Sequence, residues 1–257
     1  MTVPTEGSDN EQSSERPESL LPRSKRRRFT PLKVANQIPK RRRKEIEKAL
    51  EGSSGTPKKW SRQIGPKNHA FLRKRIPPGS IRRLEFDLLS VDIGESWPIP
   101  ITVVHGARPG PTITLLGAVH GNELVGPLAL TYLSGPNFIG SGKAIDPDVL
   151  SGTIRIVPIV NMPGYKMKSR YMPDGRDLNR SFPGKPDSNT SYRVANRFWK
   201  EIIAGSDYVI DLHTAAVGRT NMPQIRANLA HASSNKIARS FGIEAILDNV
   251  GPKGSLR

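Results

Sequence analysis

Short apolar runs, each bounded by glycine, proline or polar residues, recur along the chain from residue 84 onward. Apolar runs of this length between turn residues are typical of buried β-strands. They predict strands at residues 84–91, 99–104, 112–119, 153–160 and 208–214. Two later segments, 223–229 and 244–250, continue the same alternation. The C-terminal two thirds of the chain therefore has the pattern of a folded domain with many strands.

Helical periodicity fills the intervals between several of these strands. Residues 124–133 suit a helix, which tolerates Pro127 only in its first turn. Residues 191–203 suit a second helix, whose inward face is expected to carry Val194, Ala195, Phe198 and Ile202. A third helix is expected near residues 231–241. Alternating strands and helices predict an α/β fold with a largely parallel sheet covered on both faces.

One long stretch, residues 161–186, shows no apolar period and is rich in glycine, proline and arginine. We expect it to be a long ordered loop. Long loops inside compact domains are commonly functional, and in α/β sheets binding sites form where strands end and loops begin.

Positive charge is concentrated toward the N-terminus. The chain of 257 residues has a formal net charge of +17, yet residues 1–83 hold 22 basic and 8 acidic side chains, against 18 and 15 in the remainder. We therefore predict a disordered, basic N-terminal segment at residues 1–78 and a folded domain at residues 79–257. The basic clusters of residues 23–75 are either a solvated arm or a tether for nucleic acid or another polyanion.

Neither a secretory signal nor a membrane span is apparent. The N-terminus is polar and acidic, and no apolar run approaches the roughly 20 residues that cross a bilayer. We expect a cytoplasmic protein that makes no membrane contact.

Cysteine is absent, so any metal must be held by His, Asp or Glu. His120 ends one predicted strand and is followed three positions later by Glu123, while His213 ends another. Two histidines and one glutamate form a known catalytic zinc shell, with a fourth position left for water. The H-x-x-E spacing alone is weak evidence. The alternative is that His120 and Glu123 cap a helix and bond to backbone.

The loop SRYMPDGRDLNRSFPG (residues 169–184) is unusually rich in ionic and amide side chains. It carries Arg170, Asp174, Arg176, Asp177, Asn179 and Arg180. One interpretation is a surface loop with internal salt bridges, each worth little. The other is an anion clamp, because guanidinium groups bind carboxylates in a fork and an amide adds a directional donor. Asp177 could orient a neighbouring arginine. Asp211, two residues before His213, is expected to point to the same side of its strand as that histidine. It could orient the histidine, or it could be a buried polar group that bonds to backbone.

Three ordered motifs, GAVHGNE, SRYMPDGRDLNRSFPG and VIDLHT, resemble the succinylglutamate desuccinylase and aspartoacylase family. Its members are zinc-dependent deacylases related to the zinc carboxypeptidases. The resemblance spans roughly residues 84–257. It implies a three-layer α/β/α, carboxypeptidase-like fold with a mixed, largely parallel sheet and one catalytic Zn²⁺.

The resemblance also implies roles for individual residues. His120, Glu123 and His213 match the zinc ligands of the family. Arg170 matches the arginine that polarises the scissile carbonyl and stabilises the oxyanion. Asn179 and Arg180 match the pair that holds a substrate carboxylate; the resemblance gives Arg176 no such role.

There is one departure from the family pattern. Family members continue past GPKGSLR into a further strand that carries a catalytic Glu, whereas this sequence ends at Arg257. We therefore expect a C-terminally incomplete domain in which the general base is not identified.

The functional prediction is a zinc-dependent hydrolase. It would cleave an amide or ester bond of an acylated amino acid, or of a similar carboxylate-bearing or peptide-like substrate, through a metal-activated water. The alternative hypothesis is a catalytically impaired zinc-binding module whose basic tail contacts nucleic acid or another polyanion.

Overall fold

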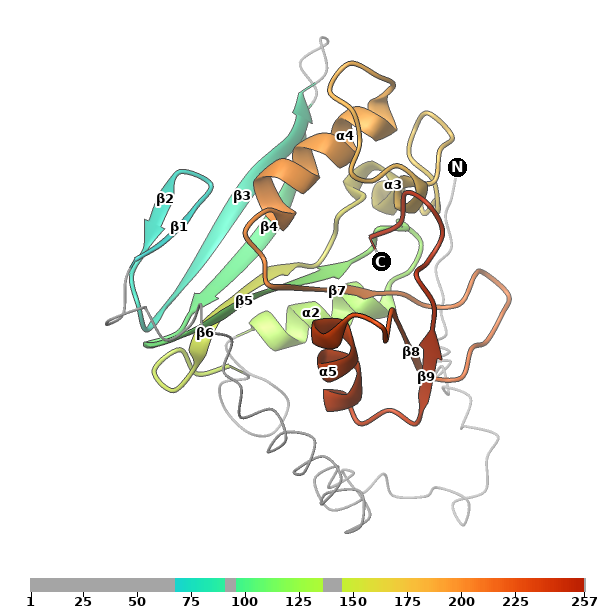
Figure 1. Ribbon diagram of the computed structural model, residues 1–257. Helices are drawn as coiled ribbons and strands as arrows, with labels where there is room; N and C mark the ends of the chain where they lie inside the picture. The colour runs from blue at the N-terminus through green and yellow to red at the C-terminus, as the bar shows by residue number, and fades with distance from the viewer. Residues whose placement is uncertain (1–67, 91–95, 136–144, 257) are drawn as a thin grey trace, which may run out of the picture. The chain divides into compact units, whose positions relative to one another are not determined.

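A mixed sheet runs through the folded part of the chain in the computed structural model, which describes residues 68–90, 96–135 and 145–256 (Figure 1). Its five strands are β3 (Ser80–Ser90), β4 (Ser96–His105), β5 (Arg108–Gly117), β6 (Ser151–Val157) and β7 (Tyr208–Leu212). Their order in the sheet is β3-β4-β6-β5-β7. All described residues lie in one compact unit, Lys44–Arg257; the other unit, Met1–Arg43, lies outside the described ranges.

The prediction of an α/β fold with a mixed sheet is confirmed, but the balance of strand directions differs from the prediction. Strand β4 pairs antiparallel with both β3 and β6, while β5 pairs parallel with β6 and β7. Parallel pairings are therefore half of the pairings in this sheet and not a majority. The physical reason is that β3 and β4 are separated by only a few residues, and so short a connection joins antiparallel neighbours.

Two helices pack against this sheet, and for one of them the sequence pattern predicted the inward face. Helix α2 (Val125–Ser134) contacts β5 and β6, and α4 (Thr190–Phe198) contacts β3. In Figure 1, α4 is drawn above the sheet and α2 below it. Helix α4 continues into a π-helical turn, η4 (Trp199–Ile203). The inward face is confirmed, because Val194, Ala195, Phe198 and Ile202 are all fully buried.

The last described elements form a small α/β unit of their own. Strands β8 (Gln224–Ala227) and β9 (Ala245–Asp248) pair in parallel, and α5 (Ala232–Ser240) lies between them in sequence. In the ranges that the structure describes, every helix is too short or too polar to traverse a lipid bilayer.

The stretch predicted as one long loop contains two short helices, which corrects that prediction. Helix α3 (Met162–Lys166) is capped by Asn161, whose side-chain oxygen accepts from the backbone N–H of Gly164 at 2.9 Å. The 3-10 helix η3 (Leu178–Arg180) is capped in the same way by Asp177. Helices of one turn are too short to show an apolar period. Their signals in the sequence were the cap residues and, for α3, Pro163 in the first turn.

The N-terminal boundary of the folded part also differs from the prediction. Strands β1 (His69–Phe71) and β2 (Lys74–Ile76) pair as a hairpin within the segment 1–78 that was predicted to be disordered. Phe71 and Ile76 belong to the hydrophobic core. Three-residue strands flanked by basic residues are too short to show the alternation of apolar and polar positions that identifies a strand, so the sequence did not reveal them. Residues 1–67 lie outside the described residues, and the predicted role of the basic segment stays a prediction.

A buried arginine joins this hairpin to the sheet and to the end of η4. Arg155 on β6 is 4% exposed. It donates to the carbonyl oxygens of Ile202 at 3.0 Å and Ala204 at 3.2 Å, and its guanidinium carbon lies 4.2 Å from the centre of the Phe71 ring. Burial lowers the pKa of Arg155 to about 10, which leaves it charged at neutral pH. A single side chain therefore satisfies two backbone acceptors and covers an aromatic face.

Replacing Arg155 with methionine is expected to lower the free energy of unfolding by about 2–4 kcal/mol, because two buried carbonyl oxygens lose their donors. Urea unfolding followed by circular dichroism measures the change. Arg226→Met is the matched control: this arginine also lies on a strand, but it is exposed, and its loss should cost no more than about 0.5 kcal/mol. Equal stabilities of the two variants would contradict the bridging role of Arg155.

Candidate metal and substrate site

The first two candidate ligands lie in the turn between β5 and α2. The strand ends at Gly117, so His120 follows it by three residues and does not end it as predicted. The turn is closed by the Glu123 N–H, which donates to the His120 carbonyl oxygen at 3.1 Å. A Cβ atom on Gly121 would come within 2.1 Å of the Gly164 carbonyl carbon in α3, so only glycine fits between the two ligands. Both His120 and Glu123 are 4% exposed.

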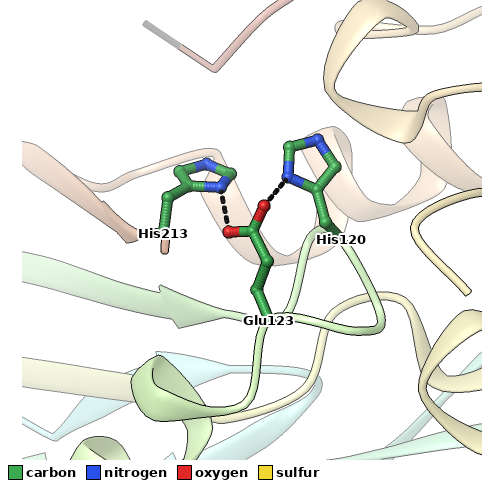
Figure 2. A group of neighbouring side chains, drawn as sticks. All are labelled: His120, Glu123 and His213. Atoms are coloured by element: carbon green, nitrogen blue, oxygen red, sulfur yellow. Dashed lines mark hydrogen bonds and ion pairs between the residues drawn. The ribbon is translucent and has the colours of Figure 1, made fainter. Parts of the chain in front are cut away.

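The third candidate ligand reaches the same point from the neighbouring strand. His213 follows β7 directly, and β7 pairs in parallel with β5, so the carboxyl ends of the two strands lie at the same edge of the sheet. The two oxygens of the Glu123 carboxylate contact Nδ1 of His120 at 2.8 Å and Nδ1 of His213 at 2.9 Å (Figure 2). The donor atoms of all three residues lie within 4.8 Å of one another. Residues 90 positions apart therefore converge on one point.

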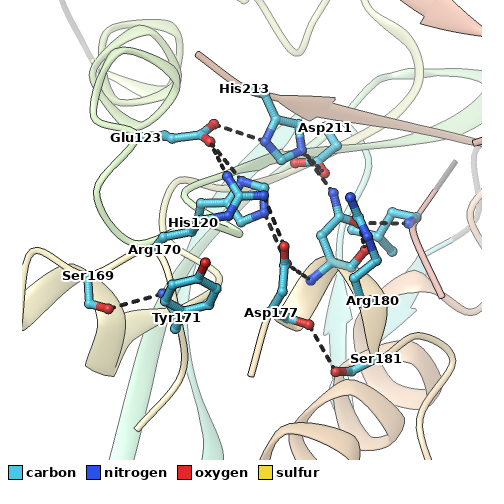
Figure 3. A network of polar contacts seen from close by, with 12 residues as sticks. His120, Glu123, Ser169, Arg170, Tyr171, Asp177, Arg180, Ser181, Asp211 and His213 are labelled. Carbon is cyan, nitrogen blue, oxygen red and sulfur yellow. Dashed lines mark hydrogen bonds and ion pairs between the residues drawn. The ribbon is translucent and has the colours of Figure 1, made fainter. Parts of the chain in front are cut away.

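The far nitrogen of each imidazole faces a carboxylate (Figure 3). Nε2 of His120 lies 3.1 Å from Asp177, and Nε2 of His213 lies 2.6 Å from Asp211. A carboxylate at one ring nitrogen fixes the orientation and tautomer of the ring and makes the other nitrogen a better ligand. Both rings thus present Nδ1 toward Glu123. The expectation that Asp211 points to the same side as His213 holds.

These contacts govern the ionisation of the group. Burial by itself would raise the pKa of Glu123, but hydrogen bonds from His120, His213 and the Thr214 N–H outweigh burial and lower that pKa to about 2. Burial would lower the pKa of His213, but Asp211 and Glu123 raise it to about 10. The pKa of His120 is also raised, because hydrogen bonds to Asp177 and Glu123 outweigh its burial. The surroundings therefore favour positive charge at the imidazoles.

The same negative surroundings suit a divalent cation. Three carboxylates, those of Glu123, Asp177 and Asp211, contact the two imidazoles. When both imidazoles are neutral, Arg170 is the only positively charged group among these contacts, and it offsets one of the three negative charges. Two nitrogens and a carboxylate are donors that zinc prefers. The side chain of His213 is 31% exposed. The donor set and the charge fit a zinc ion.

Arg170 lies beside these donors without being one of them. Its guanidinium donates to Asp177 at 2.9 Å and to Glu123 at 3.4 Å, and its side chain is 30% exposed. These two pairs fix the group next to the predicted metal position while part of it stays accessible. Arg170 and His120 together hold the pKa of Asp177 well below its usual range, although burial opposes this shift.

Asn179 and Arg180 are brought to the same place by η3. The Asn179 side chain lies between two partners: its Oδ1 accepts from the Leu256 N–H at 3.0 Å, and its Nδ2 lies 3.3 Å from Nε2 of His213. Arg180 is exposed, and its guanidinium donates to the Asn179 carbonyl oxygen at 2.7 Å. Arg176 of the same loop is exposed as well, and its guanidinium donates to the Asp174 carbonyl oxygen.

Three contacts in the site could not be predicted from the sequence. The Thr214 N–H donates to Glu123 at 2.8 Å, and Leu256 contacts Asn179 as described. Asp174 accepts from the N–H and the hydroxyl of Ser191, which pins the loop to the first turn of α4. Backbone donors carry no sequence signal. The pairing of Asp174 with Ser191 links residues whose separation in the sequence gave no reason to connect them.

Comparison with known proteins agrees with the geometry. The sequence pattern of the succinylglutamate desuccinylase/aspartoacylase catalytic domain matches residues 109–256, which is more than half of the chain. An N-alpha-acetyl-L-2,4-diaminobutyric acid deacetylase from Halomonas elongata is 39% identical over 123 residues, covering 48% of this chain and 33% of the relative.

Two solved structures are also similar. A succinylglutamate desuccinylase/aspartoacylase from Rhodobacter sphaeroides has 31% identity and a TM-score of 0.52, covering 60% of this chain and 46% of the other. A succinylglutamate desuccinylase from Silicibacter sp. TM1040 has 27% identity and a TM-score of 0.56, covering 70% and 56%. The chain spans a third of the curated relative and about half of each solved structure. By the match over residues 109–256, the chain belongs to the succinylglutamate desuccinylase/aspartoacylase family.

Proposed function

We propose that this chain provides the metal centre and the substrate clamp of a zinc-dependent hydrolase that cleaves the amide bond of an N-acylated amino acid. The observation that carries the proposal is the convergence of His120, Glu123 and His213 at the ends of two adjacent parallel strands. These three residues would hold the ion. When bound there, zinc would supply Lewis acidity and a water nucleophile at neutral pH.

The remaining residues of the site would either bind the substrate or orient the metal ligands. Arg170 would donate to the oxygen of the scissile carbonyl as negative charge develops on it, because its guanidinium is held beside the donors and is partly exposed. Asn179 and Arg180 would hold the free carboxylate of the substrate through N–H donors. Asp177 and Asp211 would keep the imidazoles oriented through Nε2.

The substrate class follows from the clamp and from the relatives. Positively charged and amide donors beside the site suit a substrate with a free carboxylate. The Halomonas elongata relative is named as a deacetylase of an acetylated amino acid, and the Silicibacter relative as a desuccinylase of succinylglutamate. An acyl-amino acid is the class that these names share. A three-layer α/β/α arrangement and a cytoplasmic location are part of the same proposal.

The direct test measures zinc and hydrolysis on the full chain. We expect about one zinc per chain by mass spectrometry and hydrolysis of at least one of N-acetyl-L-2,4-diaminobutyrate, N-succinyl-L-glutamate and N-acetyl-L-aspartate. A chelator should abolish the activity and added zinc should restore it, because the metal supplies the nucleophile. Purified protein without bound zinc, or zinc-loaded protein that cleaves none of the three compounds, would contradict the proposal.

A further inference from the structure

A turn near the end of the described residues lies directly against Asn179 and Arg180, the pair proposed to hold the substrate carboxylate and called the clamp below. The turn Pro252–Leu256 is closed by the Ser255 N–H, which donates to the Pro252 carbonyl oxygen at 3.1 Å. Two hydrogen bonds join it to the clamp: the Phe182 N–H donates to the Gly254 carbonyl oxygen at 3.0 Å, and the Leu256 N–H donates to Asn179 Oδ1 at 3.0 Å. The turn therefore contacts both the start and the end of the segment 179–182.

Gly254 makes this close approach possible. Its φ of +81° lies in the left-handed region, and an added Cβ would come within 2.2 Å of the Arg180 carbonyl oxygen and 2.5 Å of the Arg180 carbonyl carbon. Both neighbours are backbone atoms, which have no side-chain freedom to move aside. Any residue larger than glycine must therefore push the turn away from Arg180. The side chain of Leu256 is partly buried and packs against the hydrophobic core.

The contact decides which end of the Asn179 amide faces the site. A backbone N–H can only donate, so the group that meets the Leu256 N–H must be the amide oxygen. The amide nitrogen then lies on the side of His213, at 3.3 Å from Nε2. That nitrogen is a donor, as the recognition of a carboxylate requires. Without Leu256 to fix the oxygen, the amide could rotate and present an acceptor instead.

We propose that the turn Pro252–Leu256 is a positioning element for substrate recognition, in which Gly254 brings the Leu256 N–H to Asn179 and thereby makes Asn179 a donor toward the substrate carboxylate. Gly254 is a positioning residue, since it acts through Asn179 and touches no substrate. This inference rests on the proposed function of Asn179 and Arg180, and it adds the element that orients them.

The test compares two glycine-to-alanine variants in the full chain. Gly254→Ala should raise the KM for the hydrolysed acyl-amino acid about 10- to 100-fold, because misplacement of a binding group by about 1 Å has effects of this size. Its kcat should stay within about threefold of the wild-type value, and its zinc content should not change, since no ligand is touched. Gly242→Ala is the matched control: its φ is +70° with nothing within 4 Å of the added Cβ, so it bears the same backbone strain without the displacement.

Leu256→Ala separates positioning from packing, because it keeps the backbone N–H and removes the side chain that packs against the core. Its KM should rise by less than that of Gly254→Ala, because the hydrogen bond to Asn179 can still form. An equal rise of KM in Leu256→Ala and Gly254→Ala would overturn the inference, as would an unchanged KM in Gly254→Ala or a fall of kcat without a rise of KM.

Amide hydrogen exchange measured by NMR tests the contact even if no compound is hydrolysed, so a failure of the proposed function can be told apart from a failure of this inference. The Leu256 amide proton should be protected in wild type and in Gly242→Ala, and should lose that protection in Gly254→Ala. Rapid exchange in the wild-type protein, or protection retained in Gly254→Ala, would overturn the inference.

Discussion

Replacing His120 with alanine is expected to leave the protein without stoichiometric zinc and without detectable hydrolysis. The variant removes one of three donors and the imidazole that contacts both the Glu123 and the Asp177 carboxylate, which then keep Arg170 as their shared partner. A zinc ion lowers the pKa of a bound water from about 15.7 to about 7, so losing the ion removes nearly all ionised water at neutral pH. Metal content by mass spectrometry and the rate of acyl-amino acid hydrolysis measure the two effects.

Two further variants make this result specific. His213→Ala removes a proposed ligand whose side chain is 31% exposed, so it should abolish zinc binding with less disturbance of packing than the loss of buried His120. His231→Ala is the control: this histidine is exposed at the start of α5, and it should leave zinc content and activity unchanged. Zinc retained near one per chain in both ligand variants would mean that the three donors do not share an ion.

The candidate ligands could be placed from the sequence because each lies close to the end of an apolar run. His120 follows the run that becomes β5, and His213 follows the run that becomes β7. What the runs could not supply is the order of strands in the sheet. Only the pairing of β5 with β7 brings the two histidines together, and that pairing depends on packing across the whole sheet.

The orientation of the Asn179 amide could not be predicted from the sequence, for a different reason. Asn179 could be identified by its motif, but the direction of its amide depends on a backbone N–H 77 residues away. Backbone groups are present at almost every position, so no residue type marks them. Likewise, α3 and the β1–β2 hairpin were missed because elements of three to five residues are too short to repeat an apolar period twice. Local patterns thus predicted the chemistry of the site and left its geometry open.

Replacing Arg170 with alanine is expected to lower kcat/KM about 10²- to 10³-fold, the usual effect of losing one donor to a developing oxyanion. Zinc should remain at about one per chain. Arg170 contributes no ligand atom, and removing a positive charge beside Glu123 does not weaken the attraction of that carboxylate for a cation. Metal content therefore distinguishes the two roles. The His120→Ala protein should lack zinc, whereas the Arg170→Ala protein should keep it and still lose most of its activity.

Two variants test whether charge or geometry is decisive at this position. Arg170→Lys keeps the charge but loses the planar fork that reaches Asp177 and Glu123 together, so it should recover only part of the activity. Arg176→Ala removes an exposed arginine from the same loop and should have little effect. Loss of zinc together with activity in Arg170→Ala would contradict the oxyanion role. It would mean that Arg170 acts mainly through its contacts with Glu123 and Asp177, which would then hold the metal site together.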